Sequence, residues 1–246
     1  MNQQAKWLLP ALIIGLGLPL LSQAQNTDLA RDKSSNFNNG YSMAPANANS
    51  VQGSPFLLLG WVTATLRLAP DRPPLTAPLK YDVYHQELRV RRLQGDSVVV
   101  PLAQVREFSL TAPGGITPTR RFVCYPAATL PAEVGGGAAE VLADGAHAQL
   151  LKFVRKVVVK QAGDNSAYAS NSTVSALEEQ KAYFLRWPAD GHLTPIRLKR
   201  SSLEQALAGQ TAALGALKSR KGSLSAEAEV AAAIEAIDPL LTTLAR

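Results

Sequence analysis

The chain has 246 residues and a formal net charge of +6, from 25 lysines and arginines against 19 aspartates and glutamates. The positive charge is scattered, whereas nucleic-acid-binding proteins usually cluster basic residues and place aromatic residues among them, so we expect no nucleic-acid partner. The one cysteine, Cys124, rules out an intramolecular disulfide, and a hydrophobic core must therefore hold the fold together. Its apolar surroundings, RRFVCYP, predict a buried and unreactive thiol.

The first 24 residues predict a signal peptide that is cleaved on export. One positive charge, Lys6, precedes an apolar run over residues 7–21, and the SQA of residues 22–24 follows the small-x-small pattern that signal peptidase recognises. A run of about 15 residues is short for a helix that crosses about 30 Å of hydrocarbon, which weighs against a membrane anchor. We expect a mature chain that begins at Gln25, lies in the periplasm or outside the cell, and is not an integral membrane protein.

Residues 25–54 predict a disordered leader. They are rich in asparagine, serine, alanine and glycine and show no hydrophobic periodicity. A segment of this composition buries too little apolar surface to offset the entropy lost on ordering. We therefore expect the folded part of the chain to begin at residue 55.

Residues 55–200 predict an antiparallel β domain. Polar and apolar residues alternate over residues 61–68, which is typical of a strand with one buried face. Glycine–aspartate turns that favour tight hairpins occupy residues 94–96, 143–145 and 189–191, each between two strand-like runs. This short spacing favours a meander of about eight or nine strands over alternating strands and helices. The other strand-like runs cover residues 79–92, 97–111, 120–127, 138–144, 147–160, 181–188 and 193–199.

Residues 201–246 predict a C-terminal helical hairpin. Ser201 and Glu204 have the spacing of a capping box at the start of the first helix. In the second helix, Pro239 forces a kink or a new start, with Asp238 as its cap. The expected fold is mainly β (α+β): an antiparallel β-meander curled into a barrel-like or two-layer sheet, on which the helical hairpin buries its apolar stripes.

The sequence LKYDVYHQELRVRR, residues 79–92, contains the candidate catalytic residues. Asp82 with His85, or His85 with Glu87, could form the acid–base pair of a hydrolase. A structural role is favoured, because the apolar residues change parity after His85, and a turn or bulge there keeps both halves of the hairpin packed. In that arrangement Tyr81 points inward, while Asp82 and Glu87 are solvated.

The sequence gives little support for metal binding or covalent catalysis. His85 and Glu87 have the His-x-Glu spacing of zinc deaminases, but the paired cysteines of that motif are absent. A site of three histidines would require the expected turns that contain His85, His147 and His192 to meet. The nucleophile motifs Gly-x-Ser-x-Gly and Ser-x-x-Lys are also absent. We therefore expect no metal and no cofactor, and we favour a non-enzymatic role.

A candidate for ligand binding lies in LLKFVRKVVVK, residues 150–160. Lys152, Lys156 and Lys160 share one face of the expected strand. A lysine-bearing face is commonly a protected edge or a solvated surface. The alternative is a patch that binds anions.

Short motifs run through the expected β domain: Gly-Trp at residues 60–61, Leu-Lys-Tyr-Asp-Val-Tyr at 79–84, Phe-Ser-Leu at 108–110 and Lys-Ala-Tyr-Phe-Leu at 181–185. Together they resemble a set of exported β-rich proteins of Bacteroidota with no assigned activity, over about residues 55–210. The resemblance implies a location in the cell envelope and carries over no catalytic residue.

The expected function is that of an exported cell-envelope protein, a non-catalytic binding or interaction module whose partner is an envelope protein, a glycan or a lipid. One alternative is a carrier of small apolar, lipid-like ligands, with the curled sheet as a cup and the helices as a lid. A hydrolase that uses His85 with Asp82 or Glu87 is a third and less favoured reading. The sequence does not indicate an oligomeric state.

Overall fold

The structure is a computed structural model, and it reaches only part of the chain. The expected signal peptide and residues 25–50 of the expected leader lie outside the described residues. Residues 51–54 of that leader are described, and two of them form a strand. The described residues are 51–68, 72–111, 119–131, 134, 136–161 and 174–242.

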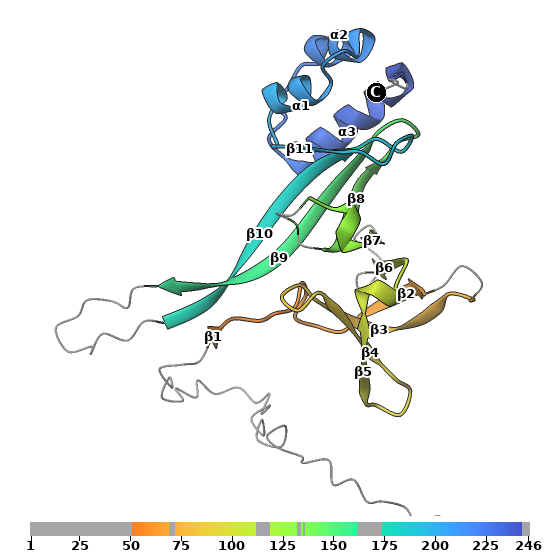
Figure 1. The fold of residues 1–246 in the computed structure, drawn as a ribbon, viewed down its shortest axis with the longest axis vertical. Coiled ribbons are helices and arrows are strands. Elements are labelled where there is room, and N and C mark those ends of the chain that lie inside the picture. Colours follow the sequence, from red (N-terminus) through yellow and green to blue (C-terminus); the bar gives the residue numbers. More distant parts are fainter. Residues whose placement is uncertain are drawn as a thin grey trace, which may run out of the picture. The chain divides into compact units, whose positions relative to one another are not determined.

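The described residues form one sheet of eleven strands, followed by three α-helices (Figure 1). None of these helices is long and apolar enough to cross a bilayer. The strands are β1 (Val51–Gln52), β2 (Val62–Arg67), β3 (Leu75–Asp82), β4 (Glu87–Arg91), β5 (Ser97–Pro101), β6 (Glu107–Thr111), β7 (Arg120–Tyr125), β8 (Gly137–Asp144), β9 (Gln149–Gln161), β10 (Val174–Arg186) and β11 (Leu193–Ile196). The helices are α1 (Arg200–Ala206), α2 (Thr211–Ser219) and α3 (Glu227–Ile237), and short 3₁₀ turns are η1 (Leu102–Gln104), η2 (Ala127–Thr129) and η3 (Asp238–Leu240).

The strand order confirms a mainly β, antiparallel fold. Neighbours follow the order β1-β10-β9-β8-β7-β6-β2-β3-β4-β5, and β11 pairs with another stretch of β10. Only the pairing of β1 with β10 is parallel among these strands. The expected barrel-like or two-layer arrangement is wrong, because the strands belong to one sheet that does not close. At one end β5 pairs with β4 alone among the described strands, and at the other end β1 and β11 complete β10.

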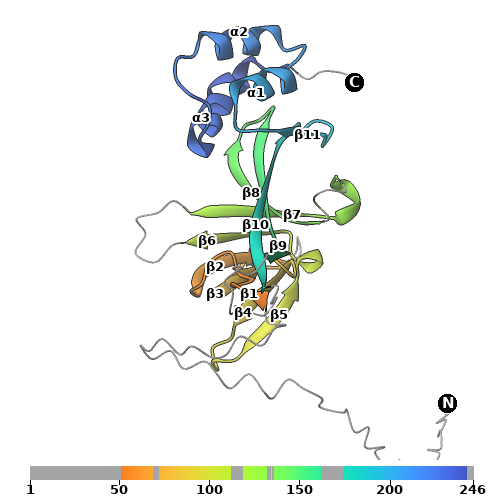
Figure 2. The ribbon, with the colours of Figure 1, turned by 90° about the vertical axis from the view of Figure 1, so that its left-hand side faces the viewer.

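The sheet curls around an aromatic core. Along β2 the buried residues are Val62, Ala64 and Leu66, which confirms the expected inward face. The rings of Tyr81 and Phe108 are 5.5 Å apart, and that of Phe108 stacks on Phe122 at 4.8 Å. These three rings come from β3, β6 and β7, and Figure 2 shows β6 and β7 running across the direction of β9 and β10. Curling lets side chains of one sheet face bury one another without a second sheet.

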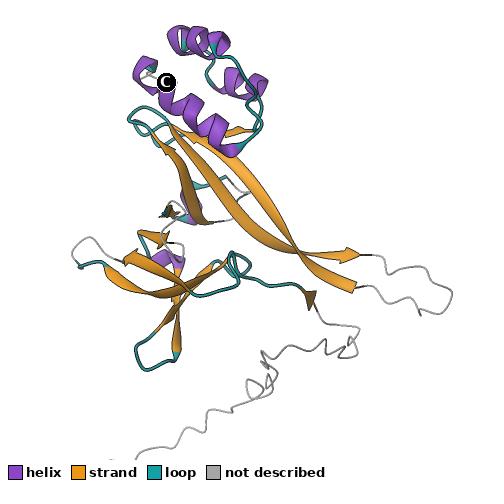
Figure 3. Ribbon diagram, turned by 180° about the vertical axis from the view of Figure 1, so that it is seen from behind, coloured by secondary structure: helices purple, strands orange, loops and turns teal. Residues whose placement is uncertain are grey.

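The C-terminal segment forms three helices, so the expected two-helix hairpin is wrong. The extra break follows α1 at Gly209, whose φ of +93° is left-handed and favours glycine at a helix end. The predicted break at Pro239 is confirmed, because α3 ends at Ile237 and η3 contains the proline. Figure 3 shows the three helices together at one end of the sheet, where their apolar side chains pack on β8, β9 and β10.

The expected capping box of Ser201 and Glu204 does not form. Helix α1 begins one residue earlier, at Arg200, and Lys199 before it provides no side-chain cap. The Arg200 guanidinium is used elsewhere: it donates to backbone carbonyls at and beyond the end of α2, those of residues 217, 220 and 222. Arg200 therefore ties the start of α1 to the end of α2.

Asp238 anchors the helices to the sheet and is not the helix cap that the sequence predicts. Its carboxylate accepts the backbone N–H groups of Ala146, His147 and Ala148, at 2.9, 2.9 and 2.8 Å, in the turn between β8 and β9. Gly145 permits this approach, because a Cβ there would collide with the carboxylate. Burial opposes ionisation, but the three N–H groups outweigh it and hold the pKa of Asp238 below its usual value.

We expect Asp238→Ala to lower the free energy of unfolding by about 2–4 kcal/mol, because three turn N–H groups lose an ionised acceptor. Since the folded pKa is depressed, this contribution is present above the unfolded pKa of about 3.9 and is lost as pH falls through the folded pKa. Chemical denaturation at pH 6.5 and at pH 3 measures both effects. Asp190→Ala, which removes an exposed carboxylate that accepts one N–H from His192, is the matched control. Equal losses in the two variants at pH 6.5 would contradict the anchoring role.

Candidate functional site

The turn between β3 and β4 is built around Asp82. The sequence predicts this carboxylate to be solvated, and that prediction is wrong because the residue has no exposed surface. Its Oδ1 accepts the backbone N–H groups of Tyr84 and His85, at 3.0 and 2.8 Å. Its Oδ2 lies 3.0 Å from His85 Nδ1. An aspartate that bonds the backbone two and three residues ahead satisfies turn donors that the strands leave unpaired.

Gln86 locks the same turn. Its backbone φ of +57° is left-handed, a conformation that residues other than glycine rarely adopt. The side chain compensates, because Oε1 accepts the Tyr81 hydroxyl at 2.7 Å and Nε2 donates to the Val83 carbonyl at 2.7 Å. Gly137 leaves room for it, since a Cβ there would collide with Gln86 Oε1. Tyr81 points inward as predicted, and burial raises its pKa.

The structure brings the three candidate catalytic residues together. Asp82, His85 and Glu87 each place a nitrogen or oxygen ligand atom within 4.8 Å of the other two. Asp82 is buried and Glu87 half-buried, whereas 54% of the His85 side chain is exposed. The Asp82–His85 pair has the geometry in which a carboxylate orients an imidazole base. A hydrolase also needs a bound substrate beside that base, and the hollow that Gln86 of this turn lines is not lined by His85.

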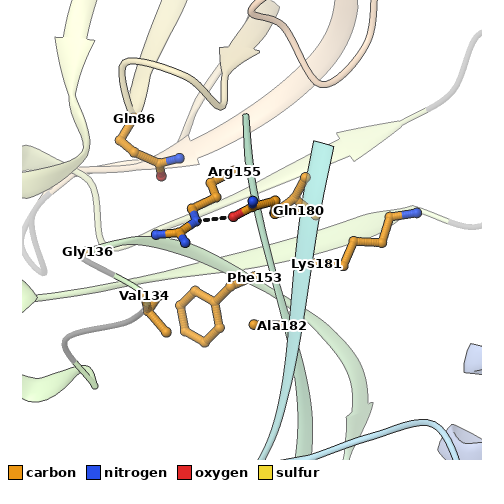
Figure 4. A pocket seen from close by; sticks show the side chains of 9 residues that line it. Gln86, Val134, Gly136, Phe153, Arg155, Gln180, Lys181 and Ala182 are labelled. Atoms are coloured by element: carbon orange, nitrogen blue, oxygen red, sulfur yellow. Dashed lines mark hydrogen bonds between the residues drawn. The ribbon is translucent and has the colours of Figure 1, made fainter. Parts of the chain in front are cut away.

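That hollow lies between β9, β10 and the segment before β8 (Figure 4). It has a volume of about 160 Å³, with Phe153, Val134 and Ala182 among its apolar walls. Arg155 Nε donates to Gln180 Oε1 at 3.1 Å across one side, and the Lys181 side chain points away from the other lining residues. Sites for drug-sized ligands usually measure about 300–1,000 Å³, so this hollow suits water or a small ion better than a lipid.

The three candidate lysines have different surroundings. Lys152 is 7% exposed, and its Nζ lies 2.7 Å from Glu140 and 2.8 Å from Glu227. Lys156 Nζ donates to the backbone carbonyls of Ser54 and Phe56, at 2.6 and 2.7 Å. Lys160 is exposed. Two of the three ammonium groups are therefore engaged in holding the fold, and the structure does not bring the three together as one anion site.

Lys152 is part of a charge cluster that joins the sheet to α3. Arg120 donates two hydrogen bonds to Glu140, at 2.6 and 2.8 Å, and Tyr183 donates to Glu227 at 2.8 Å. Burial opposes ionisation of Glu140, but Arg120 and Lys152 outweigh it and lower the pKa of this carboxyl group. The two cations and two carboxylates balance in charge, as a buried cluster requires.

A surface that the sequence reasoning missed lies on the outward face of β3 and β4. Lys80 Nζ is 4.9 Å from the centre of the Phe56 ring and 5.4 Å from that of Trp61. Arg89, which pairs with Lys80 across the two strands, lies 5.5 Å from the Phe56 ring. All three distances are typical of cation–π contacts. Period-two alternation in the sequence predicts that Lys80 and Arg89 point outward. The position of Phe56 cannot be predicted in this way, because it depends on a contact between segments that are distant in the chain.

The edge strand β5, with the sequence SVVVP, adjoins this face. The N–H of Arg92 donates to the Asp96 carbonyl, which makes these two residues a hydrogen-bonded pair at the start of the hairpin. Because bonded and non-bonded pairs alternate, Val98 and Val100 bond to β4, while Ser97 and Val99 direct their backbone groups away from it. The Val99 side chain is 52% exposed. The edge therefore presents unpaired backbone donors and acceptors beside an apolar side chain.

Cys124 shows no sign of a reactive role. It is half-buried on β7, less buried than the sequence predicts, and burial raises the pKa of its thiol to about 12. A nucleophilic cysteine needs a pKa lowered by a nearby cation or helix N-terminus. The prediction of an unreactive thiol agrees with these surroundings.

No family model matches the chain, and no curated protein and no solved structure matches it. These comparisons leave the resemblance to exported proteins of Bacteroidota as an expectation. Any function must therefore be inferred from the geometry of the described residues.

We expect Lys152→Met to lower the free energy of unfolding by about 3 kcal/mol, because two partly buried carboxylates lose their shared cation. Lys160→Met, on the same strand with an exposed ammonium group, is the control and should change stability by less than about 0.5 kcal/mol. Urea denaturation of both variants measures the difference. A stable Lys152→Met variant that has lost binding of sulfate or phosphate would instead support the anion patch.

Proposed function

We propose that this chain is an exported interaction module of the cell envelope that accepts an extended segment of a partner protein along β5. The geometry of β5 supports the interaction, and the signal peptide expected at residues 1–24 supports export. The observation that carries the proposal is the outer edge of β5, with which no other described strand pairs. An exposed strand edge is a template on which another chain can add a strand through backbone hydrogen bonds. Natural edges are usually blunted by lysines, prolines, bulges or short length, whereas β5 has a proline only at its last residue, after three consecutive valines.

The charges beside the edge favour an acidic partner segment. Arg89 and Arg91 lie on the outward face of β4, opposite Val99 and Ser97 of β5. Arg91 is exposed, and Arg89, beside the Phe56 ring, has a long ion pair with Glu87 at 3.7 Å. Carboxylate side chains on every second residue of an added strand would share this sheet face with the row of cations, two strands away across β5. The formal net charge of +6 over the whole chain favours approach of the same class of partner.

The alternatives expected from the sequence have less support. A carrier for apolar ligands needs an enclosing cup, but the described sheet is open. The hollow beside β9 and β10 measures about 160 Å³. Larger hollows of about 830, 730 and 670 Å³ lie beside β10 and β11, between β11 and α1, and between β3 and the β4–β5 turn, and all three are more open to solvent. The hydrolase is supported only by the Asp82–His85 pair. His85 does not line the hollow described above, so no substrate cavity is seen beside it there. The interaction module requires neither a cavity nor a nucleophile.

A photo-crosslinking amino acid at Ser97, in the cells that export the chain, tests this proposal. We expect a discrete adduct with another exported protein, which mass spectrometry identifies, and a loss of that adduct as salt concentration rises. Val99→Pro removes an outward N–H without removing a bond to β4 and should abolish the adduct. Val99→Thr keeps the N–H and a similar shape, so the adduct should persist.

Arg91→Glu provides a second variant that leaves the backbone unchanged, and it should reduce the adduct by reversing one charge of the row. Melting temperatures of all variants, measured on purified chains, separate loss of binding from loss of fold. The proposal fails if Ser97 forms no adduct, if the adduct contains only two copies of this chain, or if Val99→Pro leaves its yield unchanged in a folded variant.

A further inference from the structure

Asp82, His85 and Glu87 lie on one turn as one imidazole and two carboxylates, and we propose that they bind a divalent transition metal ion of the Zn²⁺ class. This assignment replaces the expectation that the chain has no metal site, and it does not depend on the proposed function of β5. Imidazole and carboxylate groups are ordinary ligands of Zn²⁺, and three protein ligands with water in the remaining position form a common zinc site.

The distances suit a shared ion. His85 Nδ1 and Asp82 Oδ2 are 3.0 Å apart. Two ligands at bond lengths of about 2.0–2.2 Å lie about 3.0–3.5 Å apart when they occupy adjacent positions around one metal. The three ligand atoms lie within 4.8 Å of one another, so a change of rotamer at Glu87 brings its carboxylate to the same centre. Glu87 is free to make this change, because its contact with Arg89 is 3.7 Å long.

The turn holds its ligands in place before any ion binds. Asp82 Oδ1 accepts two backbone N–H groups, which fixes the carboxylate and leaves Oδ2 directed at His85. Gln86 fixes the backbone between His85 and Glu87 through its bonds to Tyr81 and Val83. Hydrogen bonds to a ligating carboxylate are the usual support of metal sites, and such support reduces the entropy lost on binding.

Charge and access also fit. Two carboxylates with a neutral imidazole balance a divalent cation, whereas without a cation the buried Asp82 charge rests on two N–H groups and His85 alone among the contacts that the structure shows. The exposed side of His85 gives an ion a path from solvent to the buried Oδ2. When no metal is bound, the same distance between His85 Nδ1 and Asp82 Oδ2 allows a hydrogen bond, so the site is compatible with both the metal-free and the metal-bound state.

Titration of the purified chain with Zn²⁺, after removal of any histidine tag, tests the site. We expect one equivalent to bind by calorimetry, a rise in melting temperature with Zn²⁺ concentration, and visible absorption bands with Co²⁺ that report nitrogen and oxygen ligands. His85→Ala and the isosteric Glu87→Gln should each weaken Zn²⁺ binding at least about tenfold.

His192→Ala is the matched control, because it removes a turn histidine next to an aspartate on the distant β10–β11 connection. It should bind Zn²⁺ as tightly as the unmodified chain. Circular dichroism confirms that each variant is folded, and Glu87→Gln covers the case in which His85→Ala does not fold. Absence of a stoichiometric site overturns the proposal, as does a site that survives both substitutions or that His192→Ala weakens equally.

Discussion

The arrangement of the candidate surfaces depends on Lys156. Its ammonium group donates to the carbonyls of Ser54 and Phe56, and its backbone N–H donates to the Val83 carbonyl at 3.1 Å. One residue in the middle of β9 therefore holds the segment before β2 against the end of β3. This contact sets Phe56 over Lys80 and Arg89, and it fixes the start of the turn that contains Asp82. The turn that contains Asp82 and the edge of β5 belong to neighbouring hairpins, β3–β4 and β4–β5, which share β4.

The helices are joined to the sheet by charge as well as by apolar packing. Asp238 holds the β8–β9 turn, and the pairing of Glu227 with Lys152 holds the first turn of α3 over β9. The two contacts lie near opposite ends of α3. Apolar packing alone is non-directional and would let a short helix slide, whereas two ionic hydrogen-bonded contacts define its position along the sheet. At Glu227 the charge is matched by Lys152, whereas the Asp238 carboxylate is held by backbone N–H groups.

Much of the fold could be predicted from local sequence, and most of the site chemistry could not. Polar–apolar alternation correctly predicted the inward face of β2, and the turns with glycine and aspartate correctly predicted three hairpins, because both signals act over a few residues. The third helix was missed because Gly209 interrupts an otherwise continuous leucine pattern. Lys152 looks like a solvated strand residue in the sequence, because its partners Glu140 and Glu227 lie on β8 and α3. The bonds of Asp82 are local, to residues two and three ahead, and turn chemistry could have predicted them. The sequence shows that His85 and Glu87 are close in the chain. It does not show that the Gln86 side chain, which holds the turn between them, fits only because Gly137, 51 residues away, has no Cβ.

Pro101 sets a limit on what β5 can recruit. It pairs with Glu87 in the row whose backbone groups face away from β4, and it has no N–H to offer. Outward donors are thus confined to Ser97 and Val99, enough to dock one short strand. A chain with a long uninterrupted edge can seed stacks of strands that grow without end. Here Pro101 restricts the pairing to a short stretch, so a strand that adds to β5 gains few backbone hydrogen bonds, and we expect its contact with this edge to be reversible.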